Sequence, residues 1–163
     1  MKKLLLLIMI VGAGFTANAQ FTAGISGGLP IGDAGDLATF SIAVDLGYLF
    51  EISDSFSAGP TTGFSHSFGD EINVGGFTFE VEDVQFVPLG AAARVEVADS
   101  FTLGGDVGYA IGINDGNDGG FYYSPRAQYS VSDLIDIVFA YRGVSLDGGS
   151  WDIISLGLEF GID

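Results

Sequence analysis

The chain has 163 residues, of which 21 are acidic and only five are basic, and it contains no cysteine. Its net charge of −16 repels nucleic acid, and without cysteine neither disulfides nor thiolate metal sites can form. Only 16% of the residues are charged, whereas a soluble surface usually has about 25–35%. No later segment is apolar over the roughly 20 residues of a membrane helix, so this composition favours a membrane-spanning β-barrel.

The N-terminal residues have the pattern of a cleaved export signal. Lys2 and Lys3 precede an apolar run over residues 4–11, and Ala17-Asn18-Ala19 offers a small-x-small cleavage site. The apolar run is too short to cross a bilayer as a helix. We therefore expect residues 1–19 to be a signal peptide and residues 20–163 to form one barrel domain, whose only basic residues are three arginines.

After the signal, large apolar residues alternate with small or polar ones, a period of two that is typical of strands with unlike faces. In residues 40–50 the even positions are apolar, and residues such as Ser41 and Asp45 occupy most of the odd positions. The same pattern continues to the C-terminus. It predicts an all-β fold, an up-and-down antiparallel barrel of eight strands near residues 21–30, 38–50, 55–68, 84–97, 100–113, 120–131, 134–146 and 151–162.

The expected connections alternate between tight turns and loops rich in Gly and Asp, the loops being residues 31–37, 69–83 and 114–119. Short turns at one end and long loops at the other are typical of outer-membrane barrels, with both termini on the periplasmic side. Three prolines fall inside expected strands, although a closed barrel has no edge strand to accept a residue without an N–H group. We expect them to mark β-bulges or strand ends: Pro60, Pro88 and Pro125.

The three arginines of the expected barrel all fall on the polar face of their strands. An arginine facing lipid at mid-membrane would cost about 2–4 kcal/mol, so this face is predicted to line the barrel interior. Charges inside a narrow barrel must pair or be hydrated. We expect a lumenal charge network of Asp45, Arg94, Glu96, Asp106, Arg126, Asp136, Arg142 and Glu159; the alternative is that these charges form a solvated outer face.

Aromatic residues of the apolar face gather near the strand ends, as in the two girdles where a barrel crosses the membrane interfaces. Near the short turns these residues include Tyr48, Phe50, Phe56, Phe101, Tyr129 and Phe160. Near the loops they include Phe40, Phe64, Tyr109, Phe121 and Tyr123. Eight strands enclose an interior that side chains can fill, so a wide diffusion pore is not expected.

With its signal, eight alternating strands and girdles, the chain resembles the small OmpA/OmpX-like outer-membrane barrels. It looks closest to the porin-family barrel-domain proteins of Bacteroidota, on phrases such as Val87-Pro-Leu-Gly90 and Ser124-Pro-Arg126. Gly157-x-x-Phe160-x-Ile162 is similar to the C-terminal signal read by the barrel assembly machinery, although the chain ends in Asp163 and not in an aromatic residue. The resemblance implies a Gram-negative outer-membrane location and roles that include envelope integrity and adhesion, which the fold alone does not fix.

Three features suggest chemistry, and each has a plainer interpretation. His66 is the only histidine, but Ser65 and Ser67 point to the opposite strand face, which spoils a nucleophile–base pair. Residues 114–120 faintly resemble a calcium loop but lack its ligand spacing and closing Glu, so a solvated turn is favoured. The acidic residues of the longest loop, at 69–83, could recruit Ca²⁺ or Mg²⁺ weakly, but the favoured interpretation is that they keep the surface solvated. We expect no catalytic residue, metal or cofactor.

The sequence thus predicts a non-enzymatic cell-surface barrel with a structural or interaction role. Its expected partners are outer-membrane lipid, the barrel assembly machinery during biogenesis, and any surface ligand that the acidic loops meet. Two alternatives stay open: a lipid-modifying barrel enzyme around His66, and a secreted lipocalin-like binder with an apolar cavity.

Overall fold

The computed structural model describes residues 19–162, with the side chains of residues 72–74 excepted. The expected signal peptide, residues 1–19, lies outside this range apart from Ala19. No helix among the described residues has the length and apolarity needed to span a membrane.

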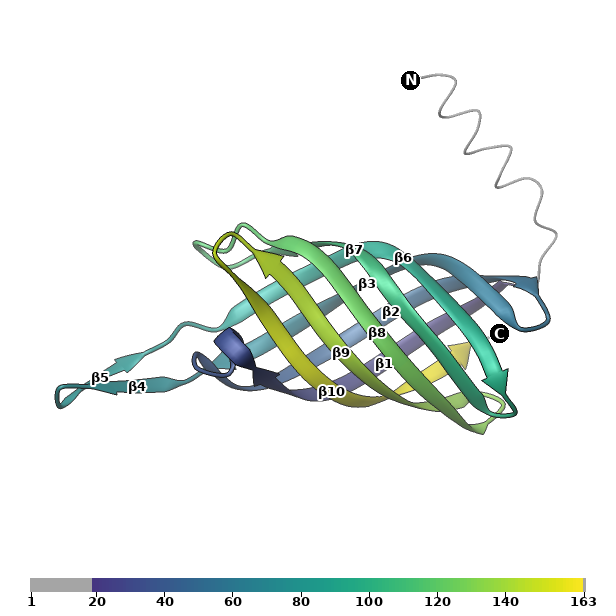
Figure 1. Cartoon of the computed structure of the whole chain (residues 1–163), viewed down its shortest axis with the longest axis horizontal. Helices are drawn as coiled ribbons and strands as arrows, with labels where there is room; N and C mark the ends of the chain where they lie inside the picture. Colours follow the sequence, from purple (N-terminus) through teal and green to yellow (C-terminus); the bar gives the residue numbers. More distant parts are fainter. Residues whose placement is uncertain (1–18, 163) are drawn as a thin grey trace, which may run out of the picture.

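Eight antiparallel strands close into a single barrel, as the alternation predicted (Figure 1). Neighbours in the sequence pair with each other around the barrel, and the first strand pairs with the last to close it. The strands are β1 (Ala19–Ile31), β2 (Ala38–Ser53), β3 (Phe56–Gly69), β6 (Val84–Ala98), β7 (Phe101–Gly112), β8 (Gly120–Ser132), β9 (Ile135–Leu146) and β10 (Gly149–Ile162).

The two ends of the barrel differ in their connections. At the short-turn end, two-residue turns at 54–55, 99–100 and 133–134 join the strands, and a register shift precedes each turn. At the loop end, three of the four connections are longer, and one of them contains the 3₁₀ helix η1 (Gly32–Ala34); the fourth, residues 147–148, is again a two-residue turn. Both ends of the described chain lie at the short-turn end, because β1 begins there and β10 finishes there.

The longest connection forms a hairpin that the sequence analysis left as a loop. β4 (Glu71–Val74) pairs with β5 (Phe77–Glu80), and the hairpin extends beyond the barrel wall (Figure 1). Gly75 and Gly76 form its turn with φ of 62° and 88°, and two consecutive positive φ angles are characteristic of the two-residue turns that match strand twist. The loop expectation was therefore wrong for this segment, because a paired glycine turn closes two short strands.

The three prolines lie well inside β3, β6 and β8, and no register shift coincides with them, so neither the bulge nor the strand-end interpretation is correct. Each proline keeps its pairing to one neighbouring strand: Pro60 to β6, and Pro88 and Pro125 to β7. Toward the other neighbour the pairing is interrupted at the proline and resumes in the same register. In an antiparallel ladder a residue exchanges N–H···O bonds with one neighbour only, so a proline weakens one ladder and spares the other.

The two faces of the wall separate as the alternation predicted. The outward apolar residues of β2, among them Ile42, Val44 and Leu46, are exposed, whereas Ser41 and Ala43 are buried inside. A lipocalin-like protein would instead turn its apolar face toward an enclosed cavity. The structure therefore contradicts the lipocalin-like alternative and presents an apolar belt to its surroundings.

Candidate functional site

Near the loop end, the interior is filled by large apolar side chains. Trp151 packs with Phe86, Tyr122, Val144 and Ile153 in one buried cluster. We call this cluster the outer plug. The sequence analysis missed this cluster, although the alternation could have indicated it. In β10, Trp151 and Ile153 occupy the same alternate positions as the small residues that line the interior.

Two serines anchor the indole of the outer plug. Trp151 Nε1 donates a hydrogen bond to Ser67 Oγ at 3.1 Å, and the hydroxyls of Ser67 and Ser41 are 2.6 Å apart. A buried indole N–H usually needs such a partner. The serines satisfy this donor in the apolar cluster, and the bond holds the ring across the interior.

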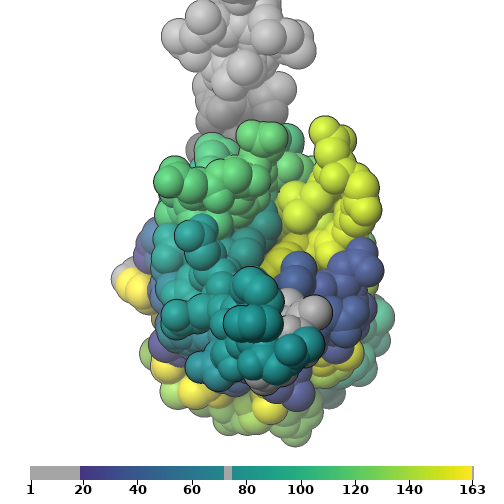
Figure 2. Space-filling view, turned by 90° about the vertical axis from the view of Figure 1, so that its left-hand side faces the viewer, coloured from purple at the N-terminus to yellow at the C-terminus, as the bar shows by residue number. Residues whose placement is uncertain are grey.

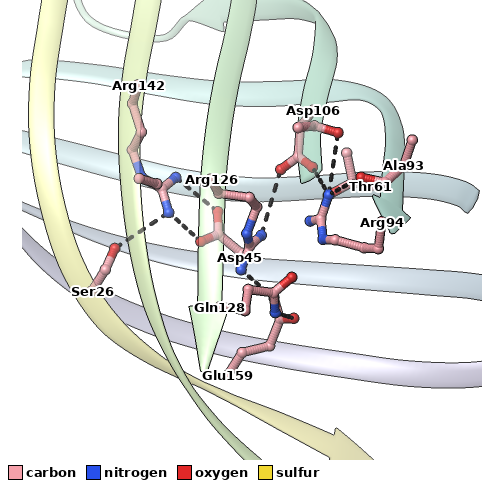
Figure 3. Close-up of polar contacts among 12 residues, drawn as sticks. Ser26, Asp45, Thr61, Ala93, Arg94, Asp106, Arg126, Gln128, Arg142 and Glu159 are labelled. Carbon is pink, nitrogen blue, oxygen red and sulfur yellow. Dashed lines mark hydrogen bonds and ion pairs between the residues drawn. The ribbon is translucent and has the colours of Figure 1, made fainter. Parts of the chain in front are cut away.

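Beside the outer plug, Arg142 forms a forked ion pair with Asp45 (Figure 3). Arg142 Nη1 donates to Asp45 Oδ1 at 3.0 Å, and Arg142 Nη2 contacts the second carboxylate oxygen. Arg142 Nη2 also donates to Ser26 Oγ at 3.3 Å, and Arg142 Nε donates to Ser155 Oγ at 3.2 Å. All three nitrogens of the guanidinium thus have acceptors, which is the condition for burying such a charge.

Two further arginines continue the ion pairs toward the short-turn end (Figure 3). Arg126 Nη2 lies 2.7 Å from Glu159 Oε2, and Arg126 Nη1 lies 3.7 Å from Asp106 Oδ2. Arg94 Nη1 lies 2.7 Å from Asp106 Oδ1 and donates to the carbonyl oxygens of Ala93 and Gly105. Asp106 on β7 therefore bridges the arginines of its two neighbouring strands, β6 and β8.

The paired charges balance, with three arginines against three carboxylates. Burying charges is costly unless opposite charges and hydrogen bonds compensate, and this equality lets the whole group sit inside the barrel without net charge. We call this group the lumenal ion-pair cluster: Asp45, Arg94, Asp106, Arg126, Arg142 and Glu159.

Two carboxylates expected in the network lie outside the cluster. Glu96 is exposed at the short-turn end, and Asp136 is half-buried and accepts a 3.4 Å hydrogen bond from Gln128 Nε2. Neither forms an ion pair with a described residue. The alternation of residues indicates which face of a strand a side chain occupies, but not how deep it lies along the barrel axis. These two side chains lie at the short-turn mouth of the barrel.

That mouth is a polar cavity of about 720 Å³, which we call the vestibule. Arg94, Gln128 and Glu159 line its deep side, next to the lumenal ion-pair cluster. Neutral side chains and five further carboxylates of the short-turn end line the remainder, the carboxylates being Glu51, Asp54, Glu96, Asp133 and Asp136.

The expected girdle residues occupy the outward positions of their strands, although Phe56, at the start of β3, also lines the vestibule. Phe101 pairs with Tyr129 toward the short turns, and Tyr109 pairs with Phe121 toward the loops. Most girdle side chains are exposed, whereas three are half-buried: Phe50, Phe56 and Tyr123. Aromatic rings also contact each other within strands, as for Tyr48 and Phe50, whose centroids are 5.1 Å apart.

His66 lies on the outer face, near the base of the β4–β5 hairpin. Its Nδ1 is 3.0 Å from Gln85 Nε2, and its Nε2 is 3.0 Å from a carboxylate oxygen of Asp83. The ring also packs against Phe68, with centroids 4.5 Å apart. Nδ1 is thus hydrogen-bonded, Nε2 lies beside a carboxylate, and Ser67 points into the barrel, so the described contacts give His66 no nucleophile to activate.

The asparagines of residues 114–119 are engaged within the protein. Asn114 Oδ1 accepts from Gln85 N at 2.9 Å, and Asn117 Oδ1 accepts from Gly119 N at 3.1 Å. Across the described part of the chain, no three His, Cys, Asp or Glu side chains gather as a metal site requires. The turn interpretation fits these hydrogen bonds.

The loop end is strongly acidic, and Figure 2 views it with the β4–β5 hairpin in teal. Its four connections, residues 32–37, 70–83, 113–119 and 147–148, contain no basic residue and ten acidic ones: Asp33, Asp36, Asp70, Glu71, Glu80, Glu82, Asp83, Asp115, Asp118 and Asp147. On the hairpin, Phe77 and Phe79 are 72% and 58% exposed. This end thus combines negative charge with exposed aromatic rings.

Comparison with known proteins identifies the family. The family described as "Outer membrane protein beta-barrel domain" matches residues 4–160. No curated protein matches the sequence. None of these findings bears on the Bacteroidota kinship, which stays a prediction.

Similar solved structures share the fold at low sequence identity. Ail, the attachment invasion locus protein of Yersinia pestis, has a TM-score of 0.59 at 15% identity, over 91% of this chain and all (100%) of Ail. Ail in complex with the heparin analogue sucrose octasulfate gives 0.58 at 13% identity, over 88% and 97%. Neisserial surface protein A gives 0.51 at 15% identity, over 87% and 96%. At such identities the likeness concerns the fold alone.

Proposed function

Because the chain belongs to the outer membrane protein β-barrel domain family and lies in the outer membrane, we propose that it is a surface-interaction barrel and not an enzyme or a wide pore. The filled interior supports the second part of this proposal. The outer plug and the lumenal ion-pair cluster occupy the barrel from the loop end inward. Surface contact at the loops is then the function that the geometry supports best.

The biogenesis expected from the sequence belongs to the same proposal. Residues 1–19 would be removed after export, and the last strand would present its outward residues Phe160 and Ile162 to the barrel assembly machinery. Both side chains are exposed on the outer face of β10, which supports such a contact.

The loop end carries the proposal, because its charge selects the kind of partner. Ten carboxylates in connections that contain no Lys or Arg attract a cationic protein surface and repel sulfated or phosphorylated ones. Phe77 and Phe79 add an apolar centre within this acidic surround, and exposed aromatic rings are enriched at protein interfaces. Ail binds a polysulfated heparin analogue, and by charge the present chain would differ from Ail in this respect.

Two probes of opposite charge test the proposal on the mature barrel in nanodiscs. Lysozyme, a basic protein, should bind at low salt and dissociate as salt rises, whereas sucrose octasulfate should not bind. Neutralising Glu71, Glu80 and Glu82 to Gln should weaken lysozyme binding by about fivefold or more, since exposed pairs contribute up to roughly 1 kcal/mol each. The matched control neutralises three acids at the short-turn end: Glu51, Glu96 and Asp133. Equal weakening by both sets, or binding of sucrose octasulfate, would contradict the proposal.

A further inference from the structure

Asp152 on β10 is an acidic residue on the outer face of the barrel wall. Its neighbours Trp151 and Ile153 are buried inside, so the alternation of the strand turns Asp152 outward. The next outward residue toward the short turns is the exposed Ile154, whereas toward the loops β10 begins only three residues away, at Gly149. Asp152 thus lies at the loop-side edge of the apolar belt, where the polar head groups of a membrane begin.

The charge of Asp152 is not neutralised by the described part of the chain. The other carboxylates of the described barrel strands face the lumenal ion-pair cluster or the vestibule. All three arginines of the described chain are lumenal, and none of its ion pairs includes Asp152. A carboxylate at the edge of the hydrocarbon region is costly without a cation, so a cation from outside the chain would stabilise it.

Two tyrosines from neighbouring strands frame Asp152, because β8, β9 and β10 lie side by side (Figure 1). Tyr123 of β8 lies across Gly143 of β9, where a Cβ atom would be 2.2 Å from Tyr123 Cζ, and its hydroxyl donates to Asp152 Oδ1 at 3.3 Å. Tyr141 of β9 stacks on Tyr123 with ring centroids 6.1 Å apart, and its hydroxyl interacts with the same carboxylate. Ser150 Oγ donates to Asp152 Oδ2. Asp152 thus receives hydrogen bonds from neutral hydroxyls but no positive charge.

This arrangement selects a cation that carries N–H groups. A tyrosine hydroxyl that donates one hydrogen bond keeps lone pairs that can accept another. The carboxylate of Asp152 and the hydroxyls of Tyr123 and Tyr141 therefore offer three acceptor groups, which match the three donors of a primary ammonium. A quaternary ammonium has no N–H to donate. Among the described residues, no three His, Cys, Asp or Glu side chains gather around a metal position.

We propose that Tyr123, Tyr141 and Asp152 bind the primary ammonium of a membrane lipid head group on the loop side of the barrel. The ammonium pairs with the carboxylate and donates to the two hydroxyls. The acyl chains of the same lipid lie against the belt below, where Ile154 and Leu156 are 40% and 59% exposed. The proposal is independent of any protein partner at the loop end, because this site lies on the barrel wall.

Native mass spectrometry of the folded mature barrel tests the site, with micelles that contain equimolar phosphatidylethanolamine and phosphatidylcholine of the same acyl chains. The wild type should retain phosphatidylethanolamine about tenfold more than phosphatidylcholine, since choline cannot make the charge-assisted hydrogen bonds. Asp152→Asn keeps an acceptor for Tyr123 but removes the charge, and should bring this ratio close to one. The matched control, Asp147→Asn, removes an exposed carboxylate from the adjacent turn and should leave the ratio unchanged.

A second variant and a soluble amine complete the test. Tyr123→Phe removes one acceptor without a change of charge and should lower the ratio about two- to fivefold. Equimolar ethanolamine should not displace the lipid, because it lacks acyl chains, and heat-modifiability on a gel shows that each variant is folded. Equal retention of the two lipids by the wild type, an equal fall in Asp147→Asn and Asp152→Asn, an unchanged ratio in Tyr123→Phe, or displacement by ethanolamine would overturn the proposal.

Discussion

Individual side chains show how this barrel holds charge inside a membrane. Arg126 contacts carboxylates of two different strands, Asp106 on β7 and Glu159 on β10. Such a contact links β8 through the interior to its neighbour β7 and, past β9, to β10. A buried ion pair adds little net stability against an apolar replacement, but loss of one partner leaves an uncompensated charge.

The substitution Arg126→Leu should therefore destabilise the barrel by about 3–5 kcal/mol, because Glu159 would stay buried without its cation. The measurement is the unfolding free energy from urea titration in detergent. Replacing both partners, Arg126→Leu with Glu159→Leu, should recover a large part of the loss. An unchanged unfolding free energy in the single variant would mean that the pair contributes no stability.

At the scale of elements, the β4–β5 hairpin is the part of the fold least supported by the barrel. Its C-terminal base is held by Asp83, whose Oδ1 accepts from Gly69 N at 2.9 Å and whose Oδ2 lies 3.0 Å from His66 Nε2. A single carboxylate thus links the base of the hairpin to β3. The lone histidine here fills a positioning role that the strand pattern could not show.

Asp83→Ala should loosen this base and increase proteolysis within residues 70–83, because both contacts are lost. The measurement is the rate of cleavage in intact proteoliposomes, followed by mass spectrometry. We expect the rate to rise about fivefold or more, because the free energy of local opening should be at least about 1 kcal/mol lower than in the wild type. Glu82→Ala, which removes an exposed acid one residue earlier, is the control. Equal rates for the two variants would show that the Asp83 contacts do not hold the hairpin.

Long strands could be predicted from the sequence, whereas short strands could not. Alternation over twelve or more residues located the eight strands within a few positions, since each strand repeats the same contrast many times. The hairpin escaped because its strands are only four residues each. The outer plug escaped because Trp151 and its neighbours are large residues on a face otherwise filled by small ones. Glu96 and Asp136 line the interior side as expected but lie too far toward the mouth to join the ion pairs, because the alternation does not indicate depth along the barrel.

At the scale of the whole molecule, the account depends on which face of the barrel wall meets lipid and which face lines the interior. If the apolar face meets lipid, the arginines must lie inside, the outer plug must close the loop end, and the two acidic regions must lie in water at opposite ends. The charge distribution follows this division: all three arginines of the described chain are lumenal, so the turns and loops at both ends contain acidic residues and no Lys or Arg. The barrel is thus negative toward both aqueous phases and neutral in the membrane.

The single tryptophan offers the most direct measurement of this assignment. Trp151 is only 5% exposed and points inward, whereas Ile154, three residues on, points outward. Fluorescence quenching by lipids brominated at a series of acyl positions should leave wild-type Trp151 nearly unquenched at every depth and strongly quench the tryptophan of the Trp151→Phe, Ile154→Trp variant. Strong quenching of Trp151 together with a protected tryptophan at position 154 would contradict the assignment.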